Sequence, residues 1–239
     1  MSAKILVCIP VLNRKKIVEQ CLPTVANGLS DDDTMNVYND GSTEYGEAWL
    51  SKLGNYGKWS IGNKNVNVGI DEQRRRHFGY FADSEEGYTH LYLTDGDAIH
   101  DPSWRSISLA IQSEHDQAPL CLYNTSVHAN MPNNTIEDNP KSNVIWRKFA
   151  PGISYLLTAE HVKKVMEQIH YVRNWDWDVP RILGHRFAVS RVSYVDHIGA
   201  GGQHHDGSEG FDGGDRCLNP TPFLVEKRKE IVAALSKEA

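Results

Sequence analysis

The chain has 239 residues, of which 40% are hydrophobic and 23% charged, which excludes a disordered polymer and allows a normal core. Its formal net charge of −6 argues against duplex nucleic acid as a partner, because proteins that bind it have a basic surface. No apolar stretch reaches the roughly 18 residues of a membrane helix, and the N-terminal apolar run is too short for a signal peptide. The four cysteines include no CxxC pair. We therefore expect a cytoplasmic protein without a membrane span and with reduced cysteines, a disulfide being the alternative.

The first half of the chain alternates strands with helices. Ile5–Ile9 is a continuous apolar run, which predicts a buried strand, and Arg14–Asn27 has helical spacing with Pro23 expected to kink or shorten the helix. The next expected elements are a strand at Met35–Asn39, a helix within Tyr45–Leu53, a strand at Ser60–Val66, a helix at Asp71–Ala82 and a strand at Thr89–Thr94. This alternation predicts an α/β fold with a mostly parallel sheet flanked by helices.

The second half is less regular. Asp101 and Pro102 predict the N-cap and first residue of a helix that buries Trp104. The remaining expected elements are a strand at Leu120–Val127, a loop at His128–Ser142, an extended segment at Val144–Leu157, a helix at Thr158–His170, a short helix after Asp176, a strand at Phe187–Ile198, a glycine-rich loop at Gly199–Arg216 and a helix at Phe223–Leu235. No repeat or linker divides the chain into independent domains.

Polar side chains follow three of the expected strands. Pro10 to Asn13 follow the first, Asp40 follows the second, and Asp95 and Asp97 follow the strand that ends at Thr94. Two carboxylates separated by a single glycine repel each other, so they fit either a bound cation or a solvated turn. Because ligands bind beyond the carboxyl ends of parallel strands, we expect these residues to converge on one site.

Four stretches in this order resemble the nucleotide-sugar half of a GT-A fold glycosyltransferase, family 2-like. They are IPVLN, NDGST, NVGIDEQRRRHFG and LYLTDGDAIHDP, and together they cover about the first 105 residues. The resemblance implies a single GT-A catalytic domain over residues 1–239, with a nucleotide-binding half at 1–105 and an acceptor half at 106–239.

The resemblance also implies roles for individual residues. Pro10, Asn13 and Asp40 would line the nucleoside pocket, and the DGD stretch would be a DxD motif in which Asp97 binds metal and Asp95 lies on the ribose side. A hard cation such as Mn²⁺ or Mg²⁺ would stabilise the charge on a diphosphate leaving group. The implied donor is a UDP-sugar.

Arg74, Arg75 and Arg76 form a charge run, which on a helix is usually a solvated face. The three positions span about 200° of helix and cannot all point one way. In the family that the chain resembles, one arginine of this helix reaches the nucleotide. Counting back from Gly79, we assign this role to Arg76.

The stretch RNWDWDVPRIL resembles the acidic motif from which the family takes its general base. The resemblance implies that Asp176 accepts the proton of the acceptor hydroxyl, with Asp178 in the same catalytic motif. Trp175 and Trp177 could offer a stacking surface to a sugar. The alternative is that one aspartate caps a helix while the tryptophans are in the core.

Histidines near the C-terminus are candidates for the metal shell, because some GT-A enzymes add a histidine there. His197 is the first choice and His204 the second, and the alternative is a histidine that only forms a hydrogen bond at a strand end. The loop at 199–216 is expected to be a lid that excludes water, or else a surface loop.

The sequence as a whole predicts a metal-dependent, inverting glycosyltransferase that moves a sugar to a hydroxyl of a glycan or another acceptor. Retaining enzymes share the fold, so inversion is an expectation. The alternatives are a non-catalytic sugar-nucleotide-binding module and a sugar nucleotidyltransferase. A nucleotidyltransferase would need a GxGxR loop after the first strand, and a dinucleotide dehydrogenase would need GxGxxG, but the chain has IPVLNRKK there.

Overall fold

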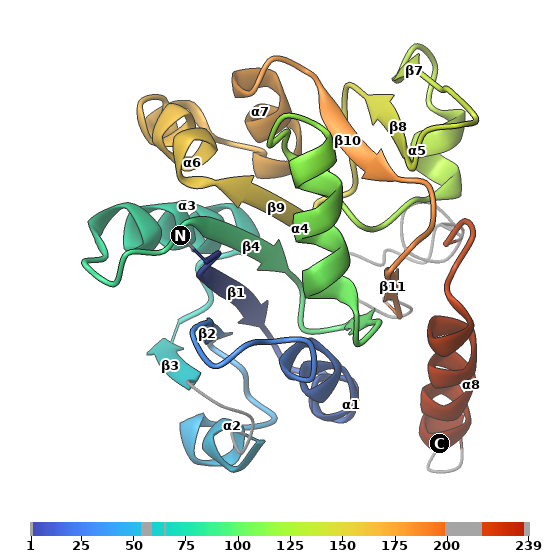
Figure 1. Cartoon of the computed structure of the whole chain (residues 1–239). Helices are drawn as coiled ribbons and strands as arrows, with labels where there is room; N and C mark the ends of the chain where they lie inside the picture. Colours follow the sequence, from blue (N-terminus) through green and yellow to red (C-terminus); the bar gives the residue numbers. More distant parts are fainter. Residues whose placement is uncertain (1, 54–58, 65, 199–216, 237–239) are drawn as a thin grey trace.

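A computed structural model of the chain describes residues 2–53, 59–64, 66–198 and 217–236, which form one large and one small sheet with helices on both faces (Figure 1). The large sheet contains, from one edge to the other, β3 (Trp59–Lys64), β2 (Thr34–Asp40), β1 (Ile5–Val11), β4 (His90–Thr94), β9 (Ser154–Thr158), β6 (Leu120–Cys121), β10 (Phe187–Ser190), β8 (Val144–Arg147) and β7 (Thr135–Glu137). The small sheet pairs β5 (Ala98–His100) with β11 (Val195–His197).

The helices of the described chain lie between and beside these strands. They are α1 (Lys15–Ala26), α2 (Glu47–Leu53), α3 (Ile70–Asp83), α4 (Trp104–Glu114), α5 (Ser126–Asn130), α6 (Ala159–Met166), α7 (Trp175–Ile182) and α8 (Pro222–Ser236), with a 3₁₀ turn at Ile169–Tyr171. The longest of them, α8, has 15 residues, so no helix in the described ranges could span a bilayer.

The direction of the strands follows from the alternation of strands and helices in the sequence. β3, β2, β1 and β4 are parallel neighbours, and along the chain β1, β2 and β3 are each joined to the next of these strands through a helix. Within the described sheet, β9 and β8 run opposite to the other strands. The expected mostly parallel sheet flanked by helices is therefore confirmed.

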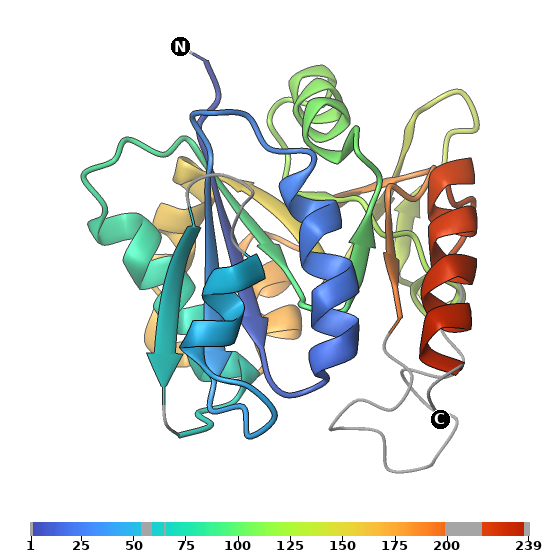
Figure 2. The same cartoon turned by 90° about the horizontal axis from the view of Figure 1, so that it is seen from below.

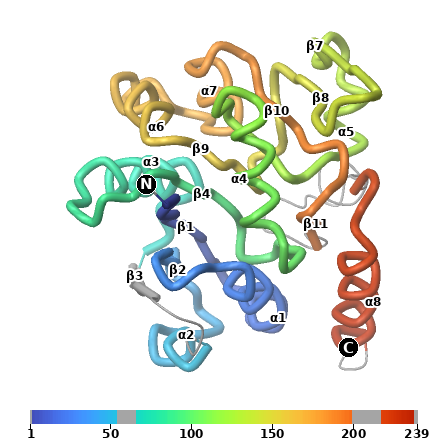
Figure 3. The backbone as a smooth tube through the Cα atoms, viewed as in Figure 1, coloured from blue at the N-terminus to red at the C-terminus, as the bar shows by residue number. Residues whose placement is uncertain are grey.

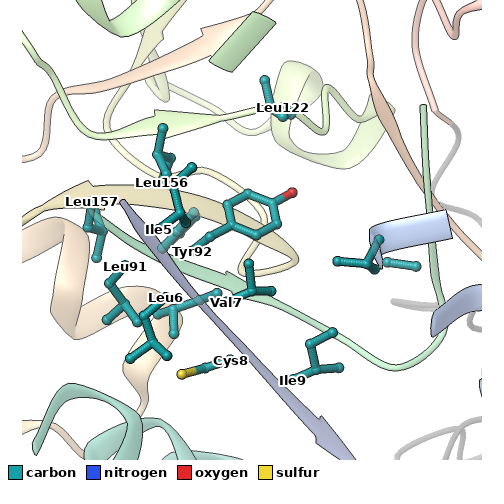
Figure 4. Packing of buried hydrophobic residues seen from close by; sticks show 14 of the residues in the cluster. Ile5, Leu6, Val7, Cys8, Ile9, Leu91, Tyr92, Leu122, Leu156 and Leu157 are labelled. Carbon is teal, nitrogen blue, oxygen red and sulfur yellow. The ribbon is translucent and has the colours of Figure 1, made fainter. Parts of the chain in front are cut away.

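The centre of the core lies where β1, β4 and β9 meet. Residues Ile5 to Ile9 are all fully buried, which explains why β1 is a continuous apolar run and does not alternate. Figure 4 shows side chains of β1, β4 and β9 lying against one another, with Tyr92 and Leu156 among them. On one side of the sheet, Tyr92 stacks on Trp104 of α4 with ring centroids 4.3 Å apart.

The contact between α1 and α4 depends on a glycine. The indole of Trp104 donates to the carbonyl oxygen of Val25 at 3.0 Å, and a Cβ added at Gly28 would overlap the indole ring.

Pro23 lies inside α1, which continues to Ala26, so the expected shortening of the helix at Pro23 is wrong. Figure 2 shows α1 between the central strands and α8.

Several expected elements in the second half begin or end elsewhere. The strand expected at Leu120–Val127 ends at Cys121, because the backbone of Leu122 and Asn124 donates to the hydroxyls of Ser154 and Ser193. Thr125 then caps α5 by accepting a hydrogen bond from the backbone of His128. The segment at Val144–Leu157 is two strands, β8 and β9. The helix expected to begin after Asp101 has Ser103 as its N-cap, because the carboxylate of Asp101 accepts from the backbone and hydroxyl of Ser103 in a preceding turn.

The strand expected at Phe187–Ile198 is divided between the two sheets. β10 belongs to the large sheet, whereas β11 pairs with β5, and Figure 3 follows the chain from one to the other. Between them, the hydroxyl of Ser193 accepts from the backbone of Asn124 at 3.0 Å and donates to the carbonyl oxygen of Leu218 at 2.8 Å. These bonds to distant segments hold the chain where it leaves the large sheet. α8 then packs beside β5 and β11.

Candidate active site

The DGD turn lies between β4 and β5, at the carboxyl end of the parallel strands. A Cβ added at Gly96 would lie 2.6 Å from Cγ1 of Val11, the last residue of β1. The glycine therefore allows the turn to pack directly on the end of the neighbouring strand. Asp95 and Asp97 stand on either side of this contact, each with an arginine from a different helical segment.

Asp95 is paired with Arg74 of α3. Nη2 of Arg74 donates to Oδ1 of Asp95 at 2.5 Å and to the carbonyl oxygen of Thr94 at 3.1 Å. The guanidinium is fully buried and lies 4.6 Å from the centre of the Trp175 ring. Burial lowers the pKa of Arg74 and raises the pKa of Asp95, although each charge partly offsets the effect on the other.

Asp97 has two cationic or potentially cationic partners on the same oxygen. Its Oδ2 accepts from Nη1 of Arg14 at 2.5 Å and lies 3.0 Å from Nε2 of His197. Burial acts to raise the pKa of Asp97, but His197 and Arg14 together lower it well below the usual range. The carboxylate of Asp97 is therefore ionised at any ordinary pH.

A short loop with unusual backbone angles positions Arg14. Asn13 and Arg14 both have left-handed backbone conformations, with φ of 51° and 58°, which side chains larger than glycine rarely adopt. Oδ1 of Asn13 accepts from the backbone of Thr43 at 2.8 Å, and its carbonyl oxygen accepts from the hydroxyl of Tyr45 at 2.9 Å. Its backbone also donates to the hydroxyl of Ser42 at 2.9 Å. These bonds to the turn after β2 hold the conformation.

The small sheet positions His197. In the ladder between β5 and β11, His197 lies opposite Ala98, the residue that follows the DGD turn. The backbone of Ile198 donates to the carbonyl oxygen of Asp97 at 3.0 Å. Arg228 of α8 supports the end of β11, because its Nη1 donates to the carboxylate of Asp196 at 2.7 Å and to the carbonyl oxygen of His197 at 3.1 Å.

Asp176 lies in the first turn of α7, near the Asp95–Arg74 pair. Burial is the main cause of both shifts in this pair, and the charge of Asp176 adds to the raised pKa of Asp95 and partly offsets the lowered pKa of Arg74. Burial raises the pKa of Asp176 itself, and the neighbouring Asp71 adds to this effect. Asp71 also accepts from the backbone of Trp175 at 2.8 Å, which ties the start of α7 to α3.

Asp178 lies two residues further on but faces its own helix start. Its Oδ2 accepts from the backbone of Arg173 at 2.8 Å and of Asn174 at 3.0 Å, and Oδ1 accepts from Arg181 at 3.1 Å. Burial acts to raise the pKa of Asp178, but these hydrogen bonds lower it below the usual value. Of the two roles considered for this residue, the geometry favours the helix cap.

Asp40 ends β2 and is held by the segment before α3. Its Oδ1 accepts from the backbone of Val68 at 2.9 Å and from the side chain of Gln73 at 2.7 Å, and its Oδ2 accepts from the backbone of Gly69 at 3.0 Å. Gln73 and Arg74 are adjacent, so consecutive residues of α3 bind Asp40 and Asp95. Pro10 lies next to Val11 in β1, close to the DGD turn.

The arginine that enters the cluster is Arg74 and not Arg76, to which the sequence assigns the nucleotide contact. Arg76 forms an ion pair with Glu72 on its own helix, with Nε and Oε1 2.7 Å apart, and its side chain is 32% exposed. Helical spacing in the sequence could have identified Arg74. It lies four residues before Phe78 and seven before Phe81, the buried aromatic residues of α3, so all three lie on one face of the helix.

Other predicted features also have definite places. Trp175 is buried beneath Arg74, whereas Trp177 is 41% exposed, with its ring 4.5 Å from that of Phe149. Only Trp177 is therefore available to stack on a ligand. His204 and the expected lid at 199–216 lie outside the described residues.

Asp97 and His197 have the chemistry to hold a divalent cation, because a carboxylate oxygen and an imidazole nitrogen lie 3.0 Å from each other. Mn²⁺ accepts both ligand types, and Mg²⁺ is usually held by one or two carboxylates together with substrate phosphates. Within the described ranges, no group of three or more His, Cys, Asp or Glu side chains could hold a metal ion. The donor set fits a cation that takes further ligands from a bound diphosphate.

A groove of about 300 Å³ lies between α1 and α8 and shares no residue with this cluster. Glutamates at both walls and Phe223 are among its lining residues, and none of them was expected to bind a ligand. The chemistry-bearing residues gather at the DGD turn, which makes that turn the candidate site.

Several solved structures are similar in fold to this chain. S. aureus TarS 1–349 is 14% identical, with a TM-score of 0.60, and the match covers 80% of this chain and 59% of that chain. TarS 1–349 in complex with UDP-GlcNAc is 15% identical, with a TM-score of 0.60 and coverage of 80% and 57%. The mannosyltransferase PcManGT from Pyrobaculum calidifontis, in complex with GDP-Man and Mn²⁺, is 13% identical, with a TM-score of 0.57 and coverage of 83% and 58%.

At these identities the likeness concerns the fold, and it confirms the expected GT-A architecture. The chain spans less than three-fifths of the length of each of these three proteins. No protein-family model matches the sequence, and no curated protein matches it either.

Proposed function

We propose that the chain is a family 2-like glycosyltransferase that moves a sugar from a nucleoside diphosphate to an acceptor hydroxyl with inversion. One observation carries the proposal. At the carboxyl ends of parallel strands, two carboxylates of one turn, Asp95 and Asp97, are each paired with an arginine, and the charge of the half-buried Asp176 acts on the first pair. Ligands of such sheets bind at this edge.

The donor would bind along the nucleotide-binding half, residues 1–105. Asp40 and Pro10 would line the nucleoside pocket, and Asp95 would face the ribose with Arg74 behind it. Asn13 would act by holding the loop after β1 in place. Asp97 and His197 would hold Mn²⁺ or Mg²⁺, which when bound supplies positive charge to the leaving diphosphate. We infer a UDP-sugar as the donor class.

Asp176 would act as the general base on the acceptor side. A carboxylate takes up a proton more readily when its pKa is raised, and burial raises that of Asp176. Its oxygen would accept the proton of the attacking hydroxyl as a bond forms between the hydroxyl oxygen and the anomeric carbon. The bond from that carbon to the diphosphate breaks on the opposite side, which inverts the configuration.

The acceptor would lie over the exposed ring of Trp177, one residue beyond the base. Its ring packs on Phe149, and the backbone of Phe149 is fixed by Asn134, whose side chain accepts from Phe149 N at 2.8 Å and donates to Phe149 O at 3.1 Å. Aromatic faces of this kind suit the apolar face of a sugar ring. The acceptor class is therefore a glycan or another molecule that offers a hydroxyl.

The test is product release by the purified chain with UDP-sugars and GDP-Man, Mn²⁺ and a panel of glycan acceptors. The proposal expects acceptor-stimulated release of the nucleoside diphosphate and transfer of the sugar, with the anomeric configuration read by NMR. Binding of the donor without release would instead indicate a non-catalytic sugar-nucleotide-binding module. Formation of a sugar nucleotide from a sugar phosphate and a nucleoside triphosphate would indicate a nucleotidyltransferase.

A further inference from the structure

The cation-binding oxygen proposed above already has a guanidinium on it. Nη1 of Arg14 lies 2.5 Å from Oδ2 of Asp97, the same oxygen that faces Nε2 of His197. The three side chains are only 13% to 21% exposed. A divalent cation bound between Asp97 and His197 would therefore stand beside the positive charge of Arg14, with little water to screen it.

The charge balance of the described cluster points the same way. Asp95 and Asp97 carry two negative charges, and Arg74 and Arg14 carry two positive ones, so these two pairs are neutral without a metal ion. The further negative charge of Asp176 acts on the Asp95–Arg74 pair and is not among the charges that shift the pKa of Asp97. A site that attracts a free dication needs surplus negative charge. A donor diphosphate would bring that surplus, and its oxygens would also offer Arg14 a new partner, because guanidinium pairs well with phosphate.

The position of Arg14 is built into the fold. Two successive left-handed residues, Asn13 and Arg14, are costly in the backbone, and the bonds of Asn13 to Thr43 and Tyr45 hold them there. The guanidinium is thus placed on Asp97 by the loop after β1. The same loop begins the nucleoside side of the proposed site, so donor binding and the position of Arg14 are linked through one segment.

We infer that Arg14 is an internal counter-ion that occupies the cation-binding carboxylate of Asp97 until a nucleoside diphosphate draws it away. This inference rests on the proposed function for its ligand class. Its consequence is an order of binding: the chain holds a divalent cation weakly by itself and tightly together with the diphosphate. Arg14 thereby keeps the DGD turn from binding metal in the absence of donor.

The test is Mn²⁺ binding, followed by the electron paramagnetic resonance signal of free Mn²⁺, for the wild-type chain and Arg14→Gln, with and without UDP. Without UDP, Arg14→Gln should bind Mn²⁺ at least tenfold more tightly than the wild type. UDP should tighten Mn²⁺ binding at least tenfold in the wild type and much less in Arg14→Gln. Equal Mn²⁺ affinity of the two chains without UDP would overturn the inference.

Three controls complete the design. Arg75→Gln removes a partly exposed arginine that pairs with Glu72 and should leave Mn²⁺ binding unchanged. Asp97→Asn should abolish the tight binding gained by Arg14→Gln, and persistence of that binding would overturn the assignment to Asp97. If Arg14→Gln does not fold, Arg14→Lys takes its place, because lysine keeps the positive charge on a shorter side chain. Arg14→Lys should bind Mn²⁺ more tightly than the wild type, by less than tenfold. Unchanged or weaker Mn²⁺ binding by Arg14→Lys would overturn the inference.

The metal measurement without UDP does not depend on sugar transfer. Tight Mn²⁺ binding by Arg14→Gln would therefore stand even if no donor were turned over, in which case the proposed function alone would fail. Conversely, product release with equal Mn²⁺ affinities would leave the proposed function and remove the counter-ion role.

Discussion

The two carboxylates of the DGD turn lie two residues apart, yet their surroundings act on them in opposite directions. Asp95 is bound to a fully buried arginine, and burial raises its pKa in spite of this partner. Asp97 is also buried, but His197 and Arg14 on one oxygen lower its pKa. Anionic neighbours separate the two, because the charges of Asp97 and Asp176 add to the effect of burial on Asp95, whereas the charged groups around Asp97 lower its pKa.

The difference suggests a division of labour. Asp95 and Arg74 connect the turn to α3 and to the ring of Trp175, so this pair has a structural role in the site. Asp97 stays ionised and faces an imidazole, so its oxygen is the one suited to a cation or to a positive group that replaces it. The predictions below change one member of this arrangement at a time.

The largest effect is expected for Asp176→Asn. An amide cannot accept the proton of the acceptor hydroxyl, so kcat should fall by about 10²- to 10⁴-fold while UDP binding is retained. Asp178→Asn is the matched control, because its carboxylate binds the helix start, and its kcat should change by less than about tenfold. Equal kcat losses in the two variants would contradict the assignment of the base.

The pH dependence of kcat gives a second check on Asp176. Because burial raises its pKa, the carboxyl group takes up a proton at a higher pH than the usual value of about 3.9 for aspartate. Only the ionised form can act as a base, so kcat should fall as the pH drops through this raised pKa. The residual activity of Asp176→Asn should lack that acidic limb, and a limb that persists would assign it to another group.

Arg74→Ala tests the buried pair. Removal of the guanidinium leaves Asp95 without its buried partner, which should lower the free energy of unfolding by about 3–5 kcal/mol. Arg76→Ala removes a partly exposed arginine from the same helix and should cost at most about 1 kcal/mol. Urea denaturation measures the free energy of unfolding of both variants. Similar losses in the two would mean that the Arg74–Asp95 pair does not stabilise the site more than a surface ion pair does.

Gly96→Ala tests the contact beneath the turn. The added methyl group would meet Val11, so the free energy of unfolding should fall by about 1–3 kcal/mol, and Val11→Ala in the same chain should recover part of this loss. Gly79→Ala in α3 meets no atom within 4 Å and should be neutral or stabilising. A Gly96→Ala chain as stable as the wild type would show that the turn does not rest on β1.

Asp178→Ala has the smallest expected effect. Loss of its bonds to the backbone of Arg173 and Asn174 should lower the free energy of unfolding by about 0.5–2 kcal/mol. Thermal unfolding measures the change. A loss of activity without any loss of stability would indicate that Asp178 takes part in catalysis.

Asp40 and Asp95 could be predicted from the sequence because each comes at the end of an expected strand. Most residues of β2 and β4 are buried, and a parallel sheet brings the carboxyl ends of such strands together. The choice among three consecutive arginines needed the buried face of α3. Phe78 and Phe81 define that face, so Arg74 could have been chosen by helical spacing, whereas counting from Gly79 led to Arg76.

The small sheet and the Arg14 contact could not be predicted in the same way. β5 and β11 have three residues each, too few for a pattern, and their pairing depends on contacts with α8 and the DGD turn. Arg14 was assigned only to the start of a helix. Its place on Asp97 follows from left-handed backbone angles at two residues, which depend on hydrogen bonds to a different turn.

A crystal structure of the chain with UDP and Mn²⁺ would locate the metal site, because manganese is identified by its anomalous signal. We expect manganese between the carboxylate of Asp97 and the diphosphate, with the nucleoside beside Asp40 and Arg14 moved from Asp97 to a phosphate oxygen. Manganese and nucleotide bound at a place that does not touch Asp97, with the Arg14 pair intact, would contradict this expectation.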